Sequence, residues 1–129
     1  MSKFESIFDD FKNAVMRFEE VLREPKTEFV RDSAIKRFEI VFELAWKTIK
    51  AFLEEEHDIA CVSPKNCLRE AYKVGIIDYD EVWMDIVKKR NLTTHVYKEI
   101  MADNIYNELP HYLPLFQKLL SAFENQQKK

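Results

Sequence analysis

The stretch from residue 28 to residue 56 constrains the fold of this chain more than any other, because apolar residues recur along it at helical spacing. They form two adjacent stripes: Val30, Ala34, Phe38, Val41, Ala45, Ile49 and Phe52 make the first, and Ile35, Phe42, Trp46 and Leu53 make the second. A helix that is apolar over so much of its circumference is covered by neighbours on several sides. The stretch therefore predicts a long central helix.

Two other segments, residues 3–23 and 110–124, carry apolar stripes that suit packing against this central helix. Ser2, with Glu5 three residues later, has the pattern of a capping box at the start of the first segment. The chain contains one glycine, Gly75, whereas a sandwich or barrel would need many for its tight turns. We therefore predict an all-α fold, an antiparallel up-and-down helical bundle of about five to six helices.

Shorter helices are expected between the long ones. Ser63 and Pro64 suit the cap and first residue of a helix over residues 65–74, with Gly75 as its left-handed C-terminal residue. The spacing within that helix predicts that four of its residues are buried, namely Cys67, Leu68, Ala71 and Tyr72.

A threonine pair and a proline are expected to divide the second half of the chain into separate helices. Residues 78–81 open a fourth helix, where their acidic side chains suit the helix dipole. The β-branched pair 93–94 weakens that helix, and a fifth helix is expected from Tyr97 or Lys98. Pro110 breaks or kinks the fifth helix, so residues 110–124 are expected to form a last one.

Length and charge narrow the classes of function. With 129 residues, we expect one domain over residues 1–129, in which residues 125–129 are a frayed tail. The formal net charge of −3 argues against broad, sequence-independent nucleic-acid binding, but not against a small basic site. We expect no signal peptide, and no apolar run approaches the ~20 residues of a membrane span. We therefore expect a cytoplasmic protein without a membrane partner.

Cysteine and cofactor signals are weak. Cys61 and Cys67 are too few for a disulfide framework and lack the spacing of zinc ligands. They are expected to be reduced and partly buried. The sequence has neither a glycine-rich phosphate loop nor the paired Glu-x-x-His motifs of a bundle metal site, so we expect no cofactor and no metal.

Chemically versatile side chains gather in residues 88–97, a stretch that interrupts the apolar pattern. A histidine near an arginine, without metal ligands, suits reaction at phosphorus. His95 would move the proton of a ribose 2′-hydroxyl or of a leaving oxygen, and Arg90 would bind the phosphate. Because only RNA supplies such an internal nucleophile, the pair indicates metal-independent RNA cleavage. The expected phosphate or substrate contacts are Lys88, Lys89, Asn91, Thr94 and Lys98.

The same residues have simpler interpretations, which stay open at this point. Cations in the last turn of a helix complement the helix dipole, so the basic cluster also suits a helix end. On an unbroken helix Arg90 and His95 would lie about 140° apart around the axis. They converge only if the helix ends between them, or if each works with the copy on a partner subunit. Otherwise His95 is a surface or interface histidine without a catalytic role, and we expect His57 and His111 to be structural or solvated.

The run Arg90-Asn91-Leu92-Thr93-Thr94-His95-Val96-Tyr97 resembles the Arg-x4-His-x-Tyr motif of the HEPN superfamily. Residues 38–47, which read Phe-Glu-Ile-Val-Phe-Glu-Leu-Ala-Trp-Lys, resemble the central helix of its nucleotidyltransferase substrate-binding-like subgroup. Further similarity lies in residues 64–65, 69–71 and 75–77 and in Trp83. The resemblance covers nearly the whole chain and is more specific than the Arg–His spacing alone.

This resemblance implies a bundle that dimerises near the motif, and a separately encoded minimal nucleotidyltransferase as its partner in a toxin–antitoxin-like pair. It implies RNA cleavage by Arg90 and His95, and silencing through nucleotidylation of Tyr97 by the partner. The subgroup's name implies a different role, that of a non-catalytic subunit that binds substrate for the nucleotidyltransferase. A helical scaffold with an inactive motif is the third alternative.

Overall fold

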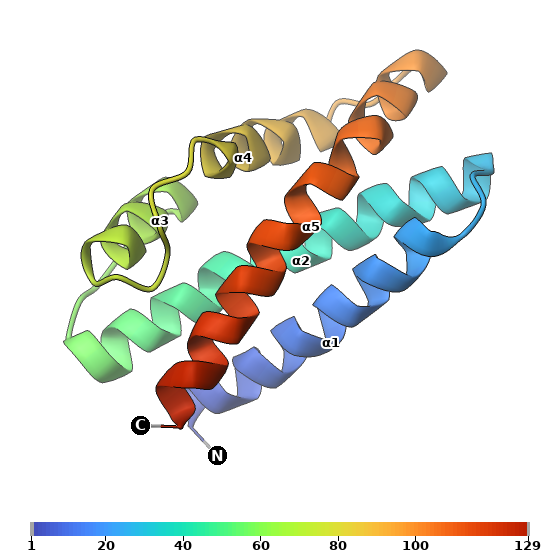
Figure 1. The fold of residues 1–129 in the computed structure, drawn as a ribbon. Helices are drawn as coiled ribbons and strands as arrows, with labels where there is room; N and C mark the ends of the chain where they lie inside the picture. Colours follow the sequence, from blue (N-terminus) through green and yellow to red (C-terminus); the bar gives the residue numbers. More distant parts are fainter. Residues whose placement is uncertain (1, 129) are drawn as a thin grey trace.

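Five α-helices form the fold in the computed structural model, which describes residues 2–128 (Figure 1). Their bounds are α1 Lys3–Arg23, α2 Glu28–His57, α3 Pro64–Lys73, α4 Val82–Thr93 and α5 Glu99–Gln127. The long helices α1, α2 and α5 pack on one another, and the shorter α3 and α4 pack beside them (Figure 1). Helix α2 contacts all four others, which confirms the predicted all-α bundle around a central helix.

Local sequence signals explain where α1, α2 and α3 begin and where α3 ends. Ser2, Thr27 and Ser63 each accept a hydrogen bond from the backbone N–H three residues later, at 3.1, 3.0 and 3.2 Å respectively. Such caps satisfy N–H groups that the first turn of a helix leaves unpaired. Gly75 has a φ of +84° and follows α3 in the left-handed conformation predicted for it. The predicted first helix and the predicted start of the second are confirmed.

Aromatic side chains from the three long helices make up much of the core. Phe38 of α2 is 0% exposed, and its ring lies 5.6 to 6.3 Å from those of Phe18, Tyr112 and Phe116. Trp83 anchors α4 to the same cluster, with its ring 5.7 Å from that of Phe116. The position of α4, and with it the polar stretch at its end, therefore depends on this core.

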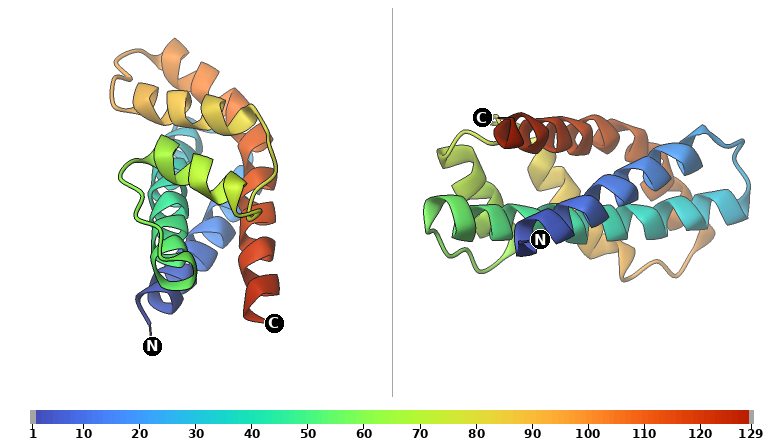
Figure 2. Two further views of the ribbon diagram at one scale, coloured as in Figure 1. Left: turned by 90° about the vertical axis from the view of Figure 1, so that its left-hand side faces the viewer. Right: turned by 90° about the horizontal axis from the view of Figure 1, so that it is seen from below.

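Helix α5 differs from the prediction, because Pro110 and Pro114 both lie inside one continuous helix. Each proline removes one backbone hydrogen bond and normally kinks a helix. Buried Leu109, Tyr112 and Phe116 hold both sides of the prolines against the core, so the chain stays helical. Helix α5 bends along its length rather than ending (Figure 2). The fold consequently has no sixth helix within residues 2–128.

Two predictions around α3 and α4 need correction. Helix α4 begins at Val82 rather than at residues 78–81, because the Asp80 carboxylate accepts the backbone N–H of Val82 at 2.9 Å in a turn that precedes the helix. Tyr72 is 51% exposed rather than buried, and its ring lies 6.1 Å from the exposed Tyr79. Burial of Cys67, Leu68 and Ala71 is confirmed.

The prediction that Cys61 and Cys67 are reduced thiols is wrong for this structure, in which the two form a disulfide. Both residues are buried, and their Cα atoms are 5.1 Å apart, within the range that a disulfide requires. Because α3 begins at Pro64, its first turn carries Cys67 back beside Cys61. The bond thus fastens the α2–α3 connection to α3.

Burial raises the pKa of Tyr112 to about 12, since the interior favours the neutral phenol. The phenol in the unfolded chain ionises near pH 10. The neutral Tyr112 phenol therefore makes its full contribution to the free energy of unfolding below about pH 10, and this contribution is lost as the pH rises towards 12. Tyr112→Phe is expected to move the alkaline unfolding midpoint, followed by circular dichroism, to higher pH. Tyr79→Phe, at an exposed site, is the control and should leave the midpoint unchanged.

Among the helices of residues 2–128, none combines the length and the apolar character needed to cross a membrane.

Candidate active site at the end of α4

Helix α4 ends at Thr93, between the two residues of the predicted pair. The Thr93 hydroxyl donates to the carbonyl oxygen of Arg90 at 2.6 Å, and the Thr94 hydroxyl donates to that of Asn91 at 2.9 Å. The hydroxyls thus satisfy carbonyls that the helix end leaves free. His95 consequently lies beyond the helix, so the predicted break between Arg90 and His95 is confirmed.

Carboxylates of α2 hold the last turn of α4. Arg90 Nη2 lies 3.2 Å from Glu43 Oε1, and the Arg90 side chain is 25% exposed. Its Nε atom is buried without a hydrogen-bond partner among residues 2–128. Thr93 Oγ1 also lies 3.1 Å from Glu39 Oε2. Arg90 is therefore held through Nη2, and other N–H groups of its guanidinium remain able to donate hydrogen bonds.

His95 and Tyr97 contact each other in the connection between α4 and α5. His95 Nδ1 lies 3.3 Å from the Tyr97 hydroxyl, and both side chains are exposed, Tyr97 to 80%. Because this contact occupies Nδ1, Nε2 is the ring nitrogen of His95 that remains available for proton transfer. No hydrogen bond or ion pair joins Arg90 to His95 in the described chain.

The residues expected to contact phosphate lie on α4 and in the connection from α4 to α5. Lys88, Asn91, Thr94 and Lys98 are exposed, and Lys89 is half-buried. Within residues 2–128, none of the three lysines forms an ion pair. Lys88 and Lys89 on α4 and Lys98 before α5 are therefore cations without a carboxylate partner among residues 2–128.

Buried Arg31 holds the end of the α4–α5 connection at which α5 begins. The Arg31 side chain is 5% exposed and pairs with Asp32 at 3.0 Å, Glu99 at 2.6 Å and Asp103 at 3.2 Å. These carboxylates raise the pKa of Arg31, with Asp32 contributing most. Lys26, 2.9 Å from Asp103, and then Arg31 lower the pKa of that carboxyl. The cluster ties the first turns of α2 to the first turns of α5.

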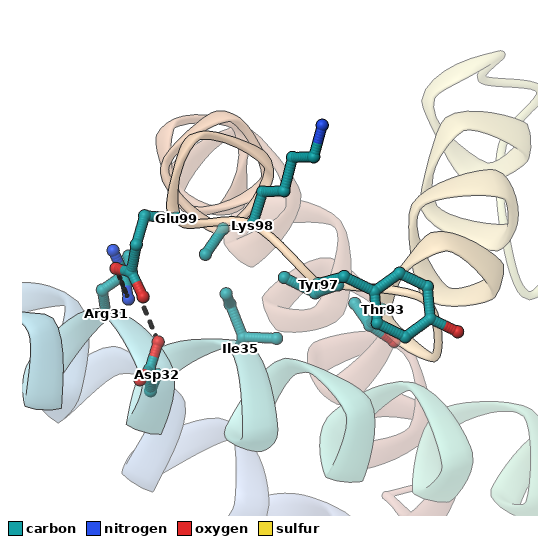
Figure 3. A pocket seen from close by; sticks show the side chains of 9 residues that line it. Arg31, Asp32, Ile35, Thr93, Tyr97, Lys98 and Glu99 are labelled. Carbon is teal, nitrogen blue, oxygen red and sulfur yellow. Dashed lines mark hydrogen bonds and ion pairs between the residues drawn. The ribbon is translucent and has the colours of Figure 1, made fainter.

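A pocket of about 300 Å³ lies between this cluster and the end of α4 (Figure 3). Arg31, Asp32 and Glu99 stand on one side, Ile35 lies below, and Thr93 and Tyr97 stand opposite (Figure 3). The pocket therefore borders the candidate site.

Sequence reasoning missed Glu39, Glu43 and the Arg31 cluster. Glu39 and Glu43 are one turn apart on the central helix, which marks a shared face. Arg31 precedes Ala34 and Ile35 by one turn on the buried stripe, so a charge at that position was a signal of a buried ion-pair cluster. Their partners on α4 and α5 could only be found from the fold.

The chain matches one protein-family model and is similar in sequence to a Haemophilus influenzae protein. A family model described as "Nucleotidyltransferase substrate binding protein like" matches residues 6–125. A Haemophilus influenzae protein named probable ribonuclease HepT is 33% identical over 84 residues, which span 62% of this chain and 58% of that protein.

Two solved structures share the fold. A Thermus thermophilus protein is 34% identical, with a TM-score of 0.80 over 86% of this chain and 96% of its own. A Haemophilus influenzae protein, described as revealing the fold of a substrate binding domain of a nucleotidyltransferase, is 25% identical. Its TM-score is 0.69 over 94% of this chain and 96% of its own.

The helical bundle and the polar stretch after α4 define a HEPN-like protein. The chain belongs to the nucleotidyltransferase substrate-binding-protein-like family. The family resemblance read from residues 38–47 and 90–97 is confirmed.

Proposed function

We propose that this chain is a metal-independent endoribonuclease, the toxin half of a toxin–antitoxin pair, in which His95 and Arg90 act on RNA. The observation that carries the proposal is the exposed His95–Tyr97 contact directly after the helix that bears Arg90. Support also comes from the relative named probable ribonuclease HepT, which the chain matches over 58% of that relative's length.

The reaction uses the 2′-hydroxyl of RNA as its nucleophile. The 2′-oxygen forms a bond to the adjacent phosphorus while the bond from phosphorus to the 5′-oxygen breaks. An imidazole takes the proton of the 2′-hydroxyl, and the departing 5′-oxygen gains a proton. The guanidinium of Arg90 stabilises charge on the phosphoryl oxygens. The products carry a 2′,3′-cyclic phosphate and a free 5′-hydroxyl.

A homodimer would complete this site. Each chain supplies one His95, whereas the reaction needs both a proton acceptor and a proton donor. Apolar side chains are exposed in the first turns of α2 and α5, Phe29 at 87% and Ile100 at 67%, and they offer surface that a second copy would cover. Doubling Lys88, Lys89 and Lys98 at such an interface would also offset the net charge of −3.

Nucleotidylation of Tyr97 by a partner nucleotidyltransferase is the proposed means of silencing. The Tyr97 hydroxyl is exposed and lies 3.3 Å from His95 Nδ1. A nucleotide attached to that oxygen would lie against the imidazole and add negative charge where the RNA phosphate binds. Modification of one atom would therefore block both the proton transfer and the anion site.

One observation favours a second function, a non-catalytic subunit that binds substrate for the nucleotidyltransferase. The Arg90 guanidinium is paired with Glu43 and has no contact with His95 within residues 2–128. An arginine that a carboxylate already neutralises binds phosphate less strongly. The protein described as a substrate binding domain of a nucleotidyltransferase also supports this alternative.

Expression of the wild-type chain without its partner separates the two functions. The ribonuclease proposal expects slowed growth and fragmented cellular RNA, and co-expression of the nucleotidyltransferase should restore both while adding a nucleotide mass to the Tyr97 peptide. Normal growth with intact RNA would refute the toxin function. An unmodified Tyr97 in rescued cells would refute only the silencing mechanism.

A further inference from the structure

The pocket between the Arg31 cluster and the end of α4 has an apolar floor and an acidic wall. Ile35, Val96 and Ala102 contribute its apolar surface. Asp32 and Glu99, whose side chains are 63% and 71% exposed, stand at its edge (Figure 3). Its volume of about 300 Å³ is at the lower end for small-molecule pockets, which suits a group of about the size of one nucleobase.

The charges around the pocket disfavour a phosphate inside it. Three carboxylates already surround Arg31, so its charge is compensated. The ammonium of Lys98 points away from the pocket (Figure 3). Asp32 and Glu99 each use one oxygen for Arg31, Oδ1 and Oε2 respectively, and each has a second oxygen that can accept a hydrogen bond. The pocket is therefore suited to a neutral group with N–H donors.

The pocket also adjoins the candidate site through two shared residues. Tyr97 lines it, and its ring points away from Arg31 (Figure 3), so that its hydroxyl contacts His95. Thr93 also lines the pocket, and its hydroxyl donates a hydrogen bond to the carbonyl oxygen of Arg90. A nucleotide whose phosphate lies near Arg90 and His95 would place a neighbouring base close to this opening.

We propose that the pocket binds one unpaired nucleobase next to the scissile phosphate, and that Asp32 and Glu99 select bases with an exocyclic amino group. This inference rests on the proposed function, because RNA is the substrate there. Cytosine and uracil test the selection directly, since they share a shape but differ at C4, where cytosine has an amino donor and uracil an oxygen acceptor.

The test measures the binding of fluorescent 2′-O-methyl oligocytidine and oligouridine by anisotropy. These oligonucleotides lack the 2′-hydroxyl nucleophile, so binding is read without cleavage. The wild-type chain should bind oligocytidine about tenfold more tightly than oligouridine. Asp32→Asn replaces an acceptor with a donor, which should reduce or reverse that ratio, and Glu99→Gln should reduce it. Asp10→Asn, an exposed site on α1, makes the same charge change and should leave the ratio unchanged.

The outcomes separate this inference from the proposed ribonuclease function. Equal affinity for the two oligonucleotides, or binding of neither, would overturn the base pocket even if unmodified RNA is cleaved. A tenfold preference that Asp32→Asn abolishes would support the pocket even if no RNA is cleaved. If Asp32→Asn and Glu99→Gln instead weaken self-association and leave the ratio unchanged, the carboxylates serve a protein contact, and the base pocket is refuted.

Discussion

Replacing His95 with alanine is expected to slow RNA cleavage by about 10²–10⁴-fold, the usual contribution of general acid–base catalysis. His95 lies beyond the end of α4 with an exposed side chain, so its removal leaves no cavity and should not change the fold. Its contact with the Tyr97 hydroxyl occupies Nδ1, so under the proposed function Nε2 would exchange protons with RNA. The loss should therefore appear in the rate of the chemical step under single-turnover conditions.

A matched control is available on α5, where His111 is also exposed. His111→Ala removes an imidazole of the same kind from a site without the Arg90 and Tyr97 neighbours, and it should leave the rate within about twofold of the wild type. If His95→Ala cleaves RNA as fast as His111→Ala, His95 has no catalytic role. Unfolding midpoints of both variants should match the wild type, which shows that any loss is chemical.

Replacing Phe38 with alanine is expected to lower the free energy of unfolding by about 3–5 kcal/mol, the usual cost of such a truncation in a core. Phe38 is 0% exposed, and its ring contacts aromatic rings from both α1 and α5. The variant leaves a cavity at the point where the three long helices meet. Because a domain is stable by only about 5–15 kcal/mol, the change removes much of its stability. Urea denaturation followed by circular dichroism measures it.

Phe29 provides the control for this second prediction, since it lies on the same helix but is 87% exposed. Phe29→Ala in the monomeric chain should change the unfolding free energy by less than about 0.5 kcal/mol. An equal loss in both variants would contradict the assignment of Phe38 to the core and of Phe29 to the surface.

Most of the fold could be predicted because apolar spacing and capping residues act locally. Ser2, Thr27 and Ser63 mark helix starts by hydrogen bonds that span three residues, and these are visible in the sequence. Failures came where distant contacts override local preference. Pro110 should interrupt a helix, but buried side chains on both sides of it keep α5 continuous. The Cys61–Cys67 bond likewise depends on how the α2–α3 connection folds.

The candidate site likewise contains residues that the sequence indicates and contacts that only the fold reveals. Arg90 and His95 could be singled out from the sequence, because they lie in the polar stretch that interrupts the apolar pattern, whereas Tyr97 was singled out through the family resemblance. The contact between Arg90 and Glu43 joins residues 47 positions apart, and that between Arg31 and Asp103 joins residues 72 apart. No local pattern specifies such pairs, so the pocket that Arg31 lines became visible only in the folded chain.

Incubation of the purified wild-type chain with a defined single-stranded RNA in EDTA tests the ribonuclease function most directly. The expected result is cleavage that EDTA does not reduce, with products that end in a 2′,3′-cyclic phosphate and begin with a 5′-hydroxyl. Intact RNA, cleavage that EDTA abolishes, or products with 5′-phosphates would contradict metal-independent cleavage by His95 and Arg90.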